Sequence, residues 1–349
     1  MPLIDNIRKA NAARQANIAK RRKNPFIEEF RAYLVINRAP ATVQKYTSTT
    51  YNFADYLKAA GNRTLRQAKA ADILGWFGKL NDRVGKARMA EMRAGLHLFY
   101  DWMIDIKGLK AHPFPRFLGK FQIDHTSITR PVPTAEQFLM LRHALNEHVK
   151  AKPEAQPRHE LRCQIELMAG TGIREGVFME LRPSHVDWSS GYIMLDDSLP
   201  NKRGHEYQPR CTPYALVVLQ RYLERWPVPK HERLWTTNKG KFDKHLRTFL
   251  KGWPDWTAHA FRYLYGCMNY FRSLEFREGQ PPSRHDIVFV RDMLGHASLA
   301  TTDRYVRLAR RLCESDEMWE AWALGKIVPI EKLKQTRGIM PQVELEGVA

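Results

Sequence analysis

The chain has 349 residues, 44% of them hydrophobic, and is therefore long enough to form two domains with separate cores. Its formal net charge of +19 indicates a polyanionic partner, either nucleic acid or a membrane surface. No run of 18 apolar residues and no signal-peptide core near Met1 is present, which favours a cytoplasmic, nucleic-acid-associated protein and argues against a membrane partner.

Residues 1–23 form a basic arm that ends in the run Lys20–Lys23. Such an arm is either solvated without fixed structure or helical when it lies on nucleic acid. After it, apolar residues spaced three and four apart predict four helices over residues 24–112, enough to close a small bundle. The expected starts of these helices are Asn24-Pro25, Ala39-Pro40, Thr64 and Gly85.

Prolines accumulate where the apolar period ends, so residues 113–133 are expected to be a linker. Thr134-Ala135-Glu136-Gln137 is a capping-box sequence that opens a second, mostly helical domain over residues 134–312. Within that domain, two short stretches predict strands of a small antiparallel sheet. The strands are Tyr192–Leu195 and Tyr207–Thr212, and residues 313–349 are expected to be a C-terminal helix and tail.

Motifs for cofactors and metals are missing from the sequence. The four cysteines are far apart and none forms a Cys-x-x-Cys pair, which argues against a disulfide framework and a paired-cysteine zinc site. No Gly-rich phosphate loop of the P-loop or Rossmann kind is present. Because Asp, Glu, His and Cys also show no cluster at ligand spacing, the sequence predicts no cofactor and no metal. The cysteines are Cys163, Cys211, Cys267 and Cys313.

Four short stretches, far apart but in a fixed order, carry side chains that can break a phosphodiester bond. They are Gly170–Arg174, Asn201–Gly204, His259–Arg262, and Leu294–His296 with Tyr305 nine residues on. Together they provide cations for the phosphate oxygens, a proton donor, a base and a nucleophile, which suffice without a metal. The candidate catalytic residues are Arg174, Lys202, His259, Arg262, His296 and Tyr305.

The local sequence indicates how the two arginines are presented. A Gly-Thr-Gly turn bends the backbone sharply and delivers Arg174, whose guanidinium can bind two phosphate oxygens at once. His259 and Arg262 are three residues apart and share one face in the first turn of a helix that Thr257 can cap. The partial positive charge of that helix end adds to Arg262, so this turn is expected to bind an anion.

A tyrosine nucleophile has to be activated. The phenol of Tyr305 is protonated at neutral pH, so its attack needs either a base or a pKa lowered by the cationic cluster. Two other tyrosines, Tyr263 and Tyr265, lie close to Arg262 in the sequence, and core packing accounts for both. Tyr305 is therefore the predicted nucleophile. His296, after a glycine that permits close approach, is expected to hydrogen-bond a phosphate oxygen or the nucleophile.

These stretches resemble the boxes of the tyrosine recombinases, the phage-integrase and Xer family. The likeness spans residues 25–312 and is most specific in His-x-x-Arg, Leu-Gly-His and Thr302-x-x-Tyr305. Thr42-x-x-x-Tyr46 stands where the core-binding domain of the family has the same pattern. The resemblance implies a mainly α fold, with a helical-bundle core-binding domain followed by a mostly helical catalytic domain that contains a small antiparallel sheet.

The resemblance also implies an activity: site-specific recombination of double-stranded DNA by a homo-tetramer, through a 3′-phosphotyrosyl intermediate on Tyr305. Lys202 would be the catalytic lysine and His259 the base. A C-terminal helix bearing Trp319 and Trp322 would dock on the neighbouring protomer, or would instead close the core of its own domain. The alternatives are a type IB topoisomerase and a DNA-binding relative that has lost catalysis.

The sequence departs from the family pattern in two respects. Two positions that are commonly acidic hold Val177 and His185, with Asp187 as a possible substitute, so the support of the first arginine differs from the pattern. The segment between the second and third boxes is also longer than usual. It carries Arg272–His285 and is expected to be a surface loop.

Overall fold

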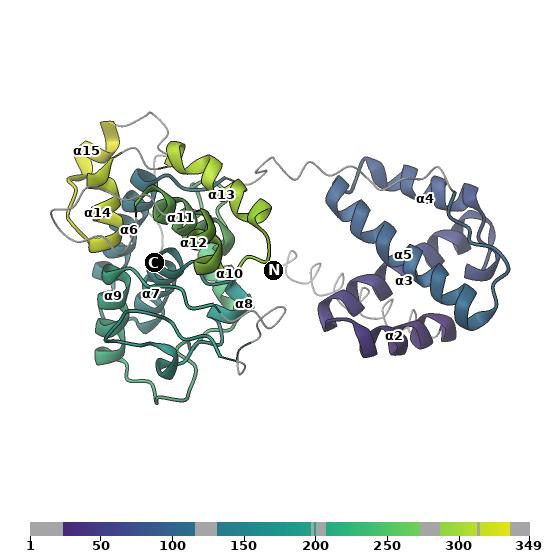
Figure 1. The fold of residues 1–349 in the computed structure, drawn as a ribbon, viewed down its shortest axis with the longest axis horizontal. Coiled ribbons are helices and arrows are strands. Elements are labelled where there is room, and N and C mark those ends of the chain that lie inside the picture. Colours follow the sequence, from purple (N-terminus) through teal and green to yellow (C-terminus); the bar gives the residue numbers. More distant parts are fainter. Residues whose placement is uncertain are drawn as a thin grey trace, which may run out of the picture. The chain divides into compact units, whose positions relative to one another are not determined.

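The computed structural model describes residues 24–115, 131–196, 199, 207–272, 287–312 and 315–335, and it is mainly helical (Figure 1). The chain divides into two compact units, Met1–His125 and Thr126–Ala349. Among the described helices, none is both long and apolar enough to cross a membrane. The basic arm, Lys202 and most of the Arg272–His285 segment lie outside the described residues.

Within the described residues 24–115, the first unit is a bundle of four helices, as the apolar spacing predicted. The first helix begins with Asn24 as N-cap, whose side chain accepts a hydrogen bond from the backbone N–H of Phe26. Thr64 starts a short 3-10 turn, and the third helix follows only at Ala70. The helices are α2 (Pro25–Asn37), α3 (Pro40–Gly61), α4 (Ala70–Asn81) and α5 (Lys86–Lys107).

Aromatic side chains fill the core of this bundle. Phe30 of α2, Phe53 of α3 and Phe99 of α5 are completely buried. The rings of Phe30 and Phe99 meet edge to face, with centroids 5.2 Å apart. Such contacts add to the burial of apolar surface, so the first unit has a core of its own.

The second unit is also helical and has a separate core. The Thr134 capping box is present: its hydroxyl accepts from the N–H of Gln137, whose side chain accepts from the N–H of Thr134. Helix α11 packs against both α7 and α13, which brings three of the predicted boxes to one region. The helices up to this point are α6 (Ala135–Ala151), α7 (Gln156–Thr171), α8 (Glu175–Phe178), α9 (Pro213–Arg225), α10 (Lys239–Phe249), α11 (Ala258–Phe271), α12 (Ile287–Leu294) and α13 (Leu299–Leu312).

The predicted antiparallel sheet is not present in the described residues. Its two segments instead contribute isolated antiparallel bridges, one between Val186 and Ile193 and one between Tyr192 and Arg210. A bridge pairs one residue with one residue, whereas a sheet needs several consecutive pairs. Residues 200–206, between the two expected strands, lie outside the described part of the chain.

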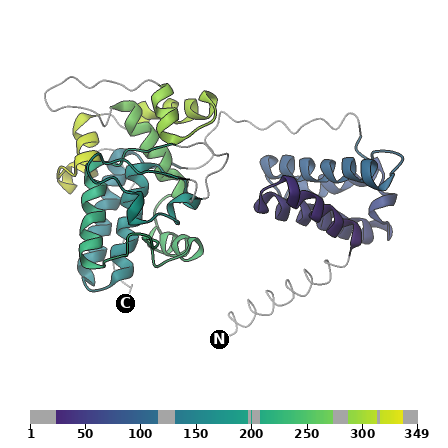
Figure 2. The ribbon, with the colours of Figure 1, turned by 60° about the horizontal axis from the view of Figure 1, so that its bottom comes forward.

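Two further helices, α14 (Asp316–Leu324) and α15 (Ile330–Gln335), follow α13. Both pack against α6 in the second unit, and they are coloured yellow in Figure 2. Trp319 and Trp322 of α14 are each 1% exposed. The indole N–H of Trp319 donates to the carbonyl of Met268, 3.0 Å away. The sequence hypothesis that these aromatics dock on a neighbouring protomer is therefore wrong for this structure, since they fill the core of their own unit.

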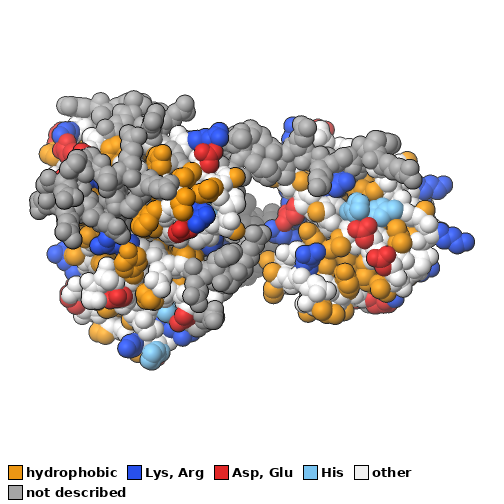
Figure 3. All heavy atoms as spheres, in the orientation of Figure 1, with side chains coloured by type: hydrophobic (Ala, Val, Ile, Leu, Met, Phe, Trp, Pro, Cys, Tyr) orange, Lys and Arg blue, Asp and Glu red, His pale blue; other side chains and the backbone are white. Residues whose placement is uncertain are grey.

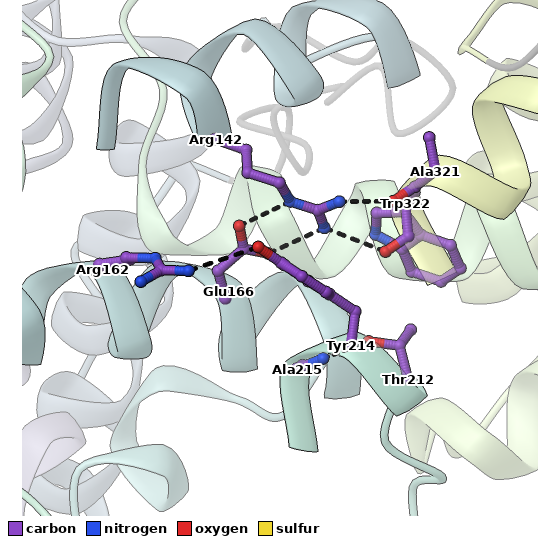
Figure 4. Close-up of polar contacts among 8 residues, drawn as sticks. All are labelled: Arg142, Arg162, Glu166, Thr212, Tyr214, Ala215, Ala321 and Trp322. Atoms are coloured by element: carbon purple, nitrogen blue, oxygen red, sulfur yellow. Dashed lines mark hydrogen bonds and ion pairs between the residues drawn. The ribbon is translucent and has the colours of Figure 1, made fainter. Parts of the chain in front are cut away.

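A buried arginine fixes the end of α14 (Figure 4). Arg142 of α6 donates to both carboxylate oxygens of Glu166 and to the carbonyls of Ala321 and Trp322. Carbonyls in the last turn of a helix lack partners within the helix, and a cation near that end also complements the helix dipole. Arg142 therefore joins α14 to α6 and α7.

Replacement of Trp322 by alanine should lower the free energy of unfolding by about 3–5 kcal/mol, because a buried indole is lost and a cavity remains. Leu324→Ala is the control: this side chain lies in the same helix but is 44% exposed, so we expect a change within about 0.5 kcal/mol. Urea unfolding of the full chain measures both. Equal, small effects would mean that α14 does not belong to this core in solution.

Candidate active site

Arg174 follows a turn that requires glycine. Helix α7 ends at Thr171, and Gly172 then adopts a φ of +60°, where a Cβ atom would lie 2.4 Å from the Tyr265 ring. The turn makes Arg174 the N-cap residue of α8. Its guanidinium donates to the carbonyl of Gly295 and lies 5.5 Å from the centroid of the Tyr207 ring. The Gly-Thr-Gly turn thus presents Arg174 as predicted, half-buried beside the Leu-Gly-His segment.

Arg262 lies one turn into α11, and it is only 2% exposed. Its guanidinium donates to the carbonyls of Gly172 and Leu294, which close α7 and α12 respectively. Arg262 thereby joins the turn that holds Arg174 to the turn that holds His296. Thr257 is the N-cap residue of α11 as predicted, but its side chain makes no capping hydrogen bond.

Arg174 and Arg262 bring two positive charges into a partly desolvated region. Burial, and then the charge of Arg262, lower the pKa of Arg174. The charge of Arg262 thus destabilises the charged form of Arg174, and an anion between them would relieve that repulsion. The arrangement favours the binding of a phosphate group.

His296 follows another glycine with positive φ. Gly295 has a φ of +58°, and a Cβ atom there would lie 2.4 Å from the Tyr207 ring. The Nδ1 atom of His296 is 3.0 Å from the hydroxyl of Thr302. Burial, and then the charges of Arg262 and Arg174, lower the pKa of His296 to about 3. The imidazole is therefore neutral at pH 7, and when Nδ1 accepts from Thr302 its other nitrogen is a hydrogen-bond donor.

Tyr305 lies on α13 with its side chain almost fully buried, at 2% exposure. Its hydroxyl is 3.5 Å from Nε2 of His259, and its ring centroid is 4.8 Å from that of His296. Burial raises the pKa of Tyr305 to about 12, although Arg262 and Arg174 act in the opposite direction. The expectation that the cationic cluster lowers this pKa is wrong for the free protein, because desolvation of the phenolate outweighs the nearby charges. Deprotonation of Tyr305 would therefore require a base, and the exposed imidazole of His259 is within reach of its hydroxyl.

Tyr263 belongs to this site, although the sequence analysis interpreted it as core packing. Its ring stacks on that of Tyr305, with centroids 3.8 Å apart and planes at 13°, and meets the His259 ring edge to face at 5.1 Å. Stacking of this kind restricts rotation of the Tyr305 ring. Tyr263 is four residues after His259, and that helical spacing is the signal that could have indicated a shared face.

The structure brings five of the six predicted residues together and does not describe the sixth, Lys202. In place of an acidic partner, the first arginine, Arg174, has the backbone carbonyl of Gly295. Val177 is buried in the core, and His185 is buried with its Nδ1 accepting from the N–H of Arg182. Asp187 is not a substitute, since it accepts hydrogen bonds from Ser189 and Ser190 in an exposed turn. The residues brought together are Arg174, His259, Arg262, His296 and Tyr305.

Metal-ligand side chains form one group of three among the described residues, and it lies in the first unit at His97, Asp101 and His112. The prediction that the sequence contains no such cluster is therefore wrong. His97 and Asp101 are four residues apart on α5, a spacing that places both on one helix face and could have been noticed. His112 joins them only through the fold.

Comparisons with known proteins find phage integrases and tyrosine recombinases. The model of the phage integrase N-terminal SAM-like domain matches residues 27–107. The tyrosine recombinase XerC of Escherichia coli O157:H7 is 23% identical over 299 residues, covering 81% of this chain and 91% of the relative. XerC of Lacticaseibacillus casei is 25% identical over 312 residues, covering 84% of this chain and 97% of the relative.

Solved structures share the fold. XerH site-specific recombinase bound to palindromic difH substrate, in a post-cleavage complex, superposes with a TM-score of 0.58 at 18% identity, covering 81% of each chain. A lambda integrase dimer bound to a COC′ core site also gives a TM-score of 0.58 at 18% identity, covering 80% of this chain and 76% of the integrase.

Proposed function

We propose that this chain, which belongs to the tyrosine recombinase family, is a site-specific DNA recombinase that cleaves and rejoins double-stranded DNA through a 3′-phosphotyrosyl bond to Tyr305. One observation carries the proposal. The hydroxyl of Tyr305 lies 3.5 Å from Nε2 of His259. In the same region, Arg174 and Arg262 donate to the carbonyls of Gly295 and Leu294, in the turn that holds His296. A nucleophile, a base and two cations for one phosphate are the groups that this reaction requires.

In the proposed cleavage, Arg174 and Arg262 bind nonbridging oxygens of the scissile phosphate. A guanidinium has five N–H donors, so each arginine can hold phosphate while it also donates to the backbone carbonyls that position it. His296, neutral at pH 7, donates a further hydrogen bond from Nε2. These fixed donors stabilise the negative charge that develops on the phosphate in the transition state.

Tyr305 then attacks the phosphorus while His259 takes its phenolic proton. The Tyr305 Oη–P bond forms as the bond from phosphorus to the 5′ oxygen breaks, and the leaving oxygen receives a proton. Attack by a 5′ hydroxyl in the reverse direction rejoins the strand and releases Tyr305. The phosphotyrosyl bond retains the energy of the phosphodiester, so the residues need no nucleotide cofactor.

We assign the protonation of the leaving oxygen to Lys202. The bridge between Tyr192 and Arg210 pairs the two segments that flank it in sequence, as expected for the base of an antiparallel hairpin. A lysine that protonates the 5′ oxygen needs a pKa lowered by desolvation, which close contact with the DNA would provide. The small sheet is part of this proposal.

The proposed partners are a DNA recombination site and further copies of the chain. A solved lambda integrase structure, with a TM-score of 0.55 at 18% identity and covering 78% of this chain, is a tetramer bound to a Holliday junction. We propose that four copies of this chain likewise assemble on DNA, in the cytoplasm, with the formal charge of +19 favouring the association.

Recombination is favoured over two alternatives. A type IB topoisomerase would use a similar residue set, but the full-length relatives of this chain reported above are recombinases. A DNA-binding protein without catalysis would not need to keep Tyr305, His259 and His296 in mutual reach.

The proposal predicts covalent trapping that does not depend on a metal. Full-length protein incubated with nicked duplexes from its native locus, in excess EDTA, should give a protein–DNA band that resists denaturation. The nick releases a short strand, so rejoining fails and the intermediate accumulates. Loss of the band in EDTA with specific restoration by Mg²⁺ would indicate a metal-dependent nuclease instead. Relaxation of supercoiled DNA by monomers, without recombinant products, would favour the topoisomerase.

A further inference from the structure

Two imidazoles converge on one carboxylate at the end of the first unit. His97 and Asp101 lie one turn apart on α5, and the Nδ1 atom of His97 is 2.9 Å from Oδ2 of Asp101. His112 comes from the segment after the helix, and its Nε2 atom is 3.4 Å from Oδ1 of the same carboxylate. All three residues are partly exposed, although the Nε2 atom of His112 itself is buried. Figure 3 shows histidine and acidic side chains side by side on the surface of the first unit.

Aromatic rings support the two imidazoles. The ring centroids of His97 and His112 are 4.4 Å apart, and the Phe114 ring lies 5.1 Å from the first and 5.4 Å from the second. The Tyr100 ring is 5.8 Å from the His112 ring. Neutral imidazole is the form of histidine that binds a metal ion, and the neighbouring rings hold both imidazoles in place.

We propose that His97, Asp101 and His112 form a binding site for one divalent transition-metal ion, of which Zn²⁺ is the representative. The ligand atoms all lie within 4.8 Å of one another. Two ligands each about 2.1 Å from a tetrahedral ion are about 3.4 Å apart. The two contacts of 2.9 and 3.4 Å, which different oxygens of Asp101 make, lie near that separation. Two imidazoles and one carboxylate suit zinc, cobalt, nickel or copper rather than Mg²⁺ or Ca²⁺, which prefer oxygen ligands.

Proton positions change when the ion enters. In the metal-free chain, Nδ1 of His112 accepts from the backbone N–H of Phe114, so the neutral ring has its proton on Nε2, facing Asp101. Coordination through Nε2 moves that proton to Nδ1 and breaks the Phe114 hydrogen bond. His97 similarly exchanges a hydrogen bond to Asp101 for a bond to the ion. The ion thus replaces two hydrogen bonds that already hold the ligands near their binding positions.

Binding would fix the segment that follows α5. Helix α5 ends at Lys107, Gly108 turns the chain with a φ of +64°, and His112 then returns against the helix. An ion that joins His112 to two residues of α5 closes this short loop and stabilises the folded first unit. The proposed metal site lies in the first unit, whereas Tyr305 lies in the second. The inference therefore does not rest on the proposed recombinase function.

Zinc binding to the untagged full-length chain tests the proposal. Isothermal titration of metal-free protein with Zn²⁺ should give one site per chain, and Co²⁺ in the same site should show visible d–d absorption. His97→Ala and Asp101→Asn should each weaken Zn²⁺ binding by at least about tenfold. Asp101→Asn keeps the shape and hydrogen-bonding capacity of the side chain, so it separates loss of a ligand from loss of fold. Thermal unfolding should shift upward with Zn²⁺ in the wild type and not in these variants.

Two controls replace similar residues outside the cluster. Asp105→Asn removes an exposed carboxylate one turn further along α5, and His231→Ala removes an exposed histidine in the second unit. Both should bind Zn²⁺ as the wild type does. The proposal is overturned if the wild type shows no saturable Zn²⁺ binding, or if the cluster variants bind it as tightly as the controls. In either case the trio is only a hydrogen-bonded group.

Discussion

Tyr305→Phe should abolish the covalent protein–DNA complex while leaving DNA binding intact. The substitution removes only the phenolic oxygen, and the phenylalanine ring can keep its place between Tyr263 and His296. Binding depends on the many basic groups of the chain rather than on this hydroxyl. A covalent-trapping assay on nicked duplexes measures formation of the covalent complex, and gel-shift titration at fixed salt measures DNA affinity.

Tyr263→Phe is the matched control for this experiment. Tyr263 is the stacking partner of Tyr305, so the two hydroxyl groups belong to adjacent rings of one site. Removal of the Tyr263 hydroxyl should leave the covalent complex, since stacking is retained. If the Tyr305 variant still forms the complex and the Tyr263 variant does not, the nucleophile has been assigned to the wrong tyrosine.

Arg174→Ala should slow single-turnover cleavage by about 10²–10³-fold, which corresponds to about 2.7–4 kcal/mol for one lost donor to the transition state. Arg174→Lys should restore little of this rate, because an ammonium group cannot bind two phosphate oxygens in a planar fork. Arg174 gives a clearer test than Arg262. The latter is buried and closes two helix ends, so its removal also destabilises the fold.

The control for charge is Arg233→Ala. Arg233 lies in the same unit, is 61% exposed and pairs with Glu180, so its replacement removes one positive charge away from the site. Cleavage by this variant at saturating DNA should match the wild type. A rate for Arg174→Ala within threefold of the wild type would remove Arg174 from the proposed mechanism.

Local patterns predicted most helices because their causes are local. The Asn24 cap, the Thr134 capping box and the glycine turns before Arg174 and His296 depend on side chains and backbone within a few residues. The sheet was predicted from short apolar stretches in the same way, and the described residues of its two segments form only isolated bridges. Strand pairing depends on partners further along the chain, so a local pattern is weaker evidence for it.

The sequence by itself was enough to predict six site residues, because the order and spacing of the boxes can be read along the chain. The structure brings the five described ones together. Only the tertiary structure decided the pKa values and the contacts of those residues. Burial raises the pKa of Tyr305 despite two nearby arginines, and stacking brings Tyr263 into the site. Packing also places α14 in its own core and returns His112 to α5. The desolvation of a side chain and its contacts with distant segments depend on which surfaces pack together. That packing exists only in the folded chain.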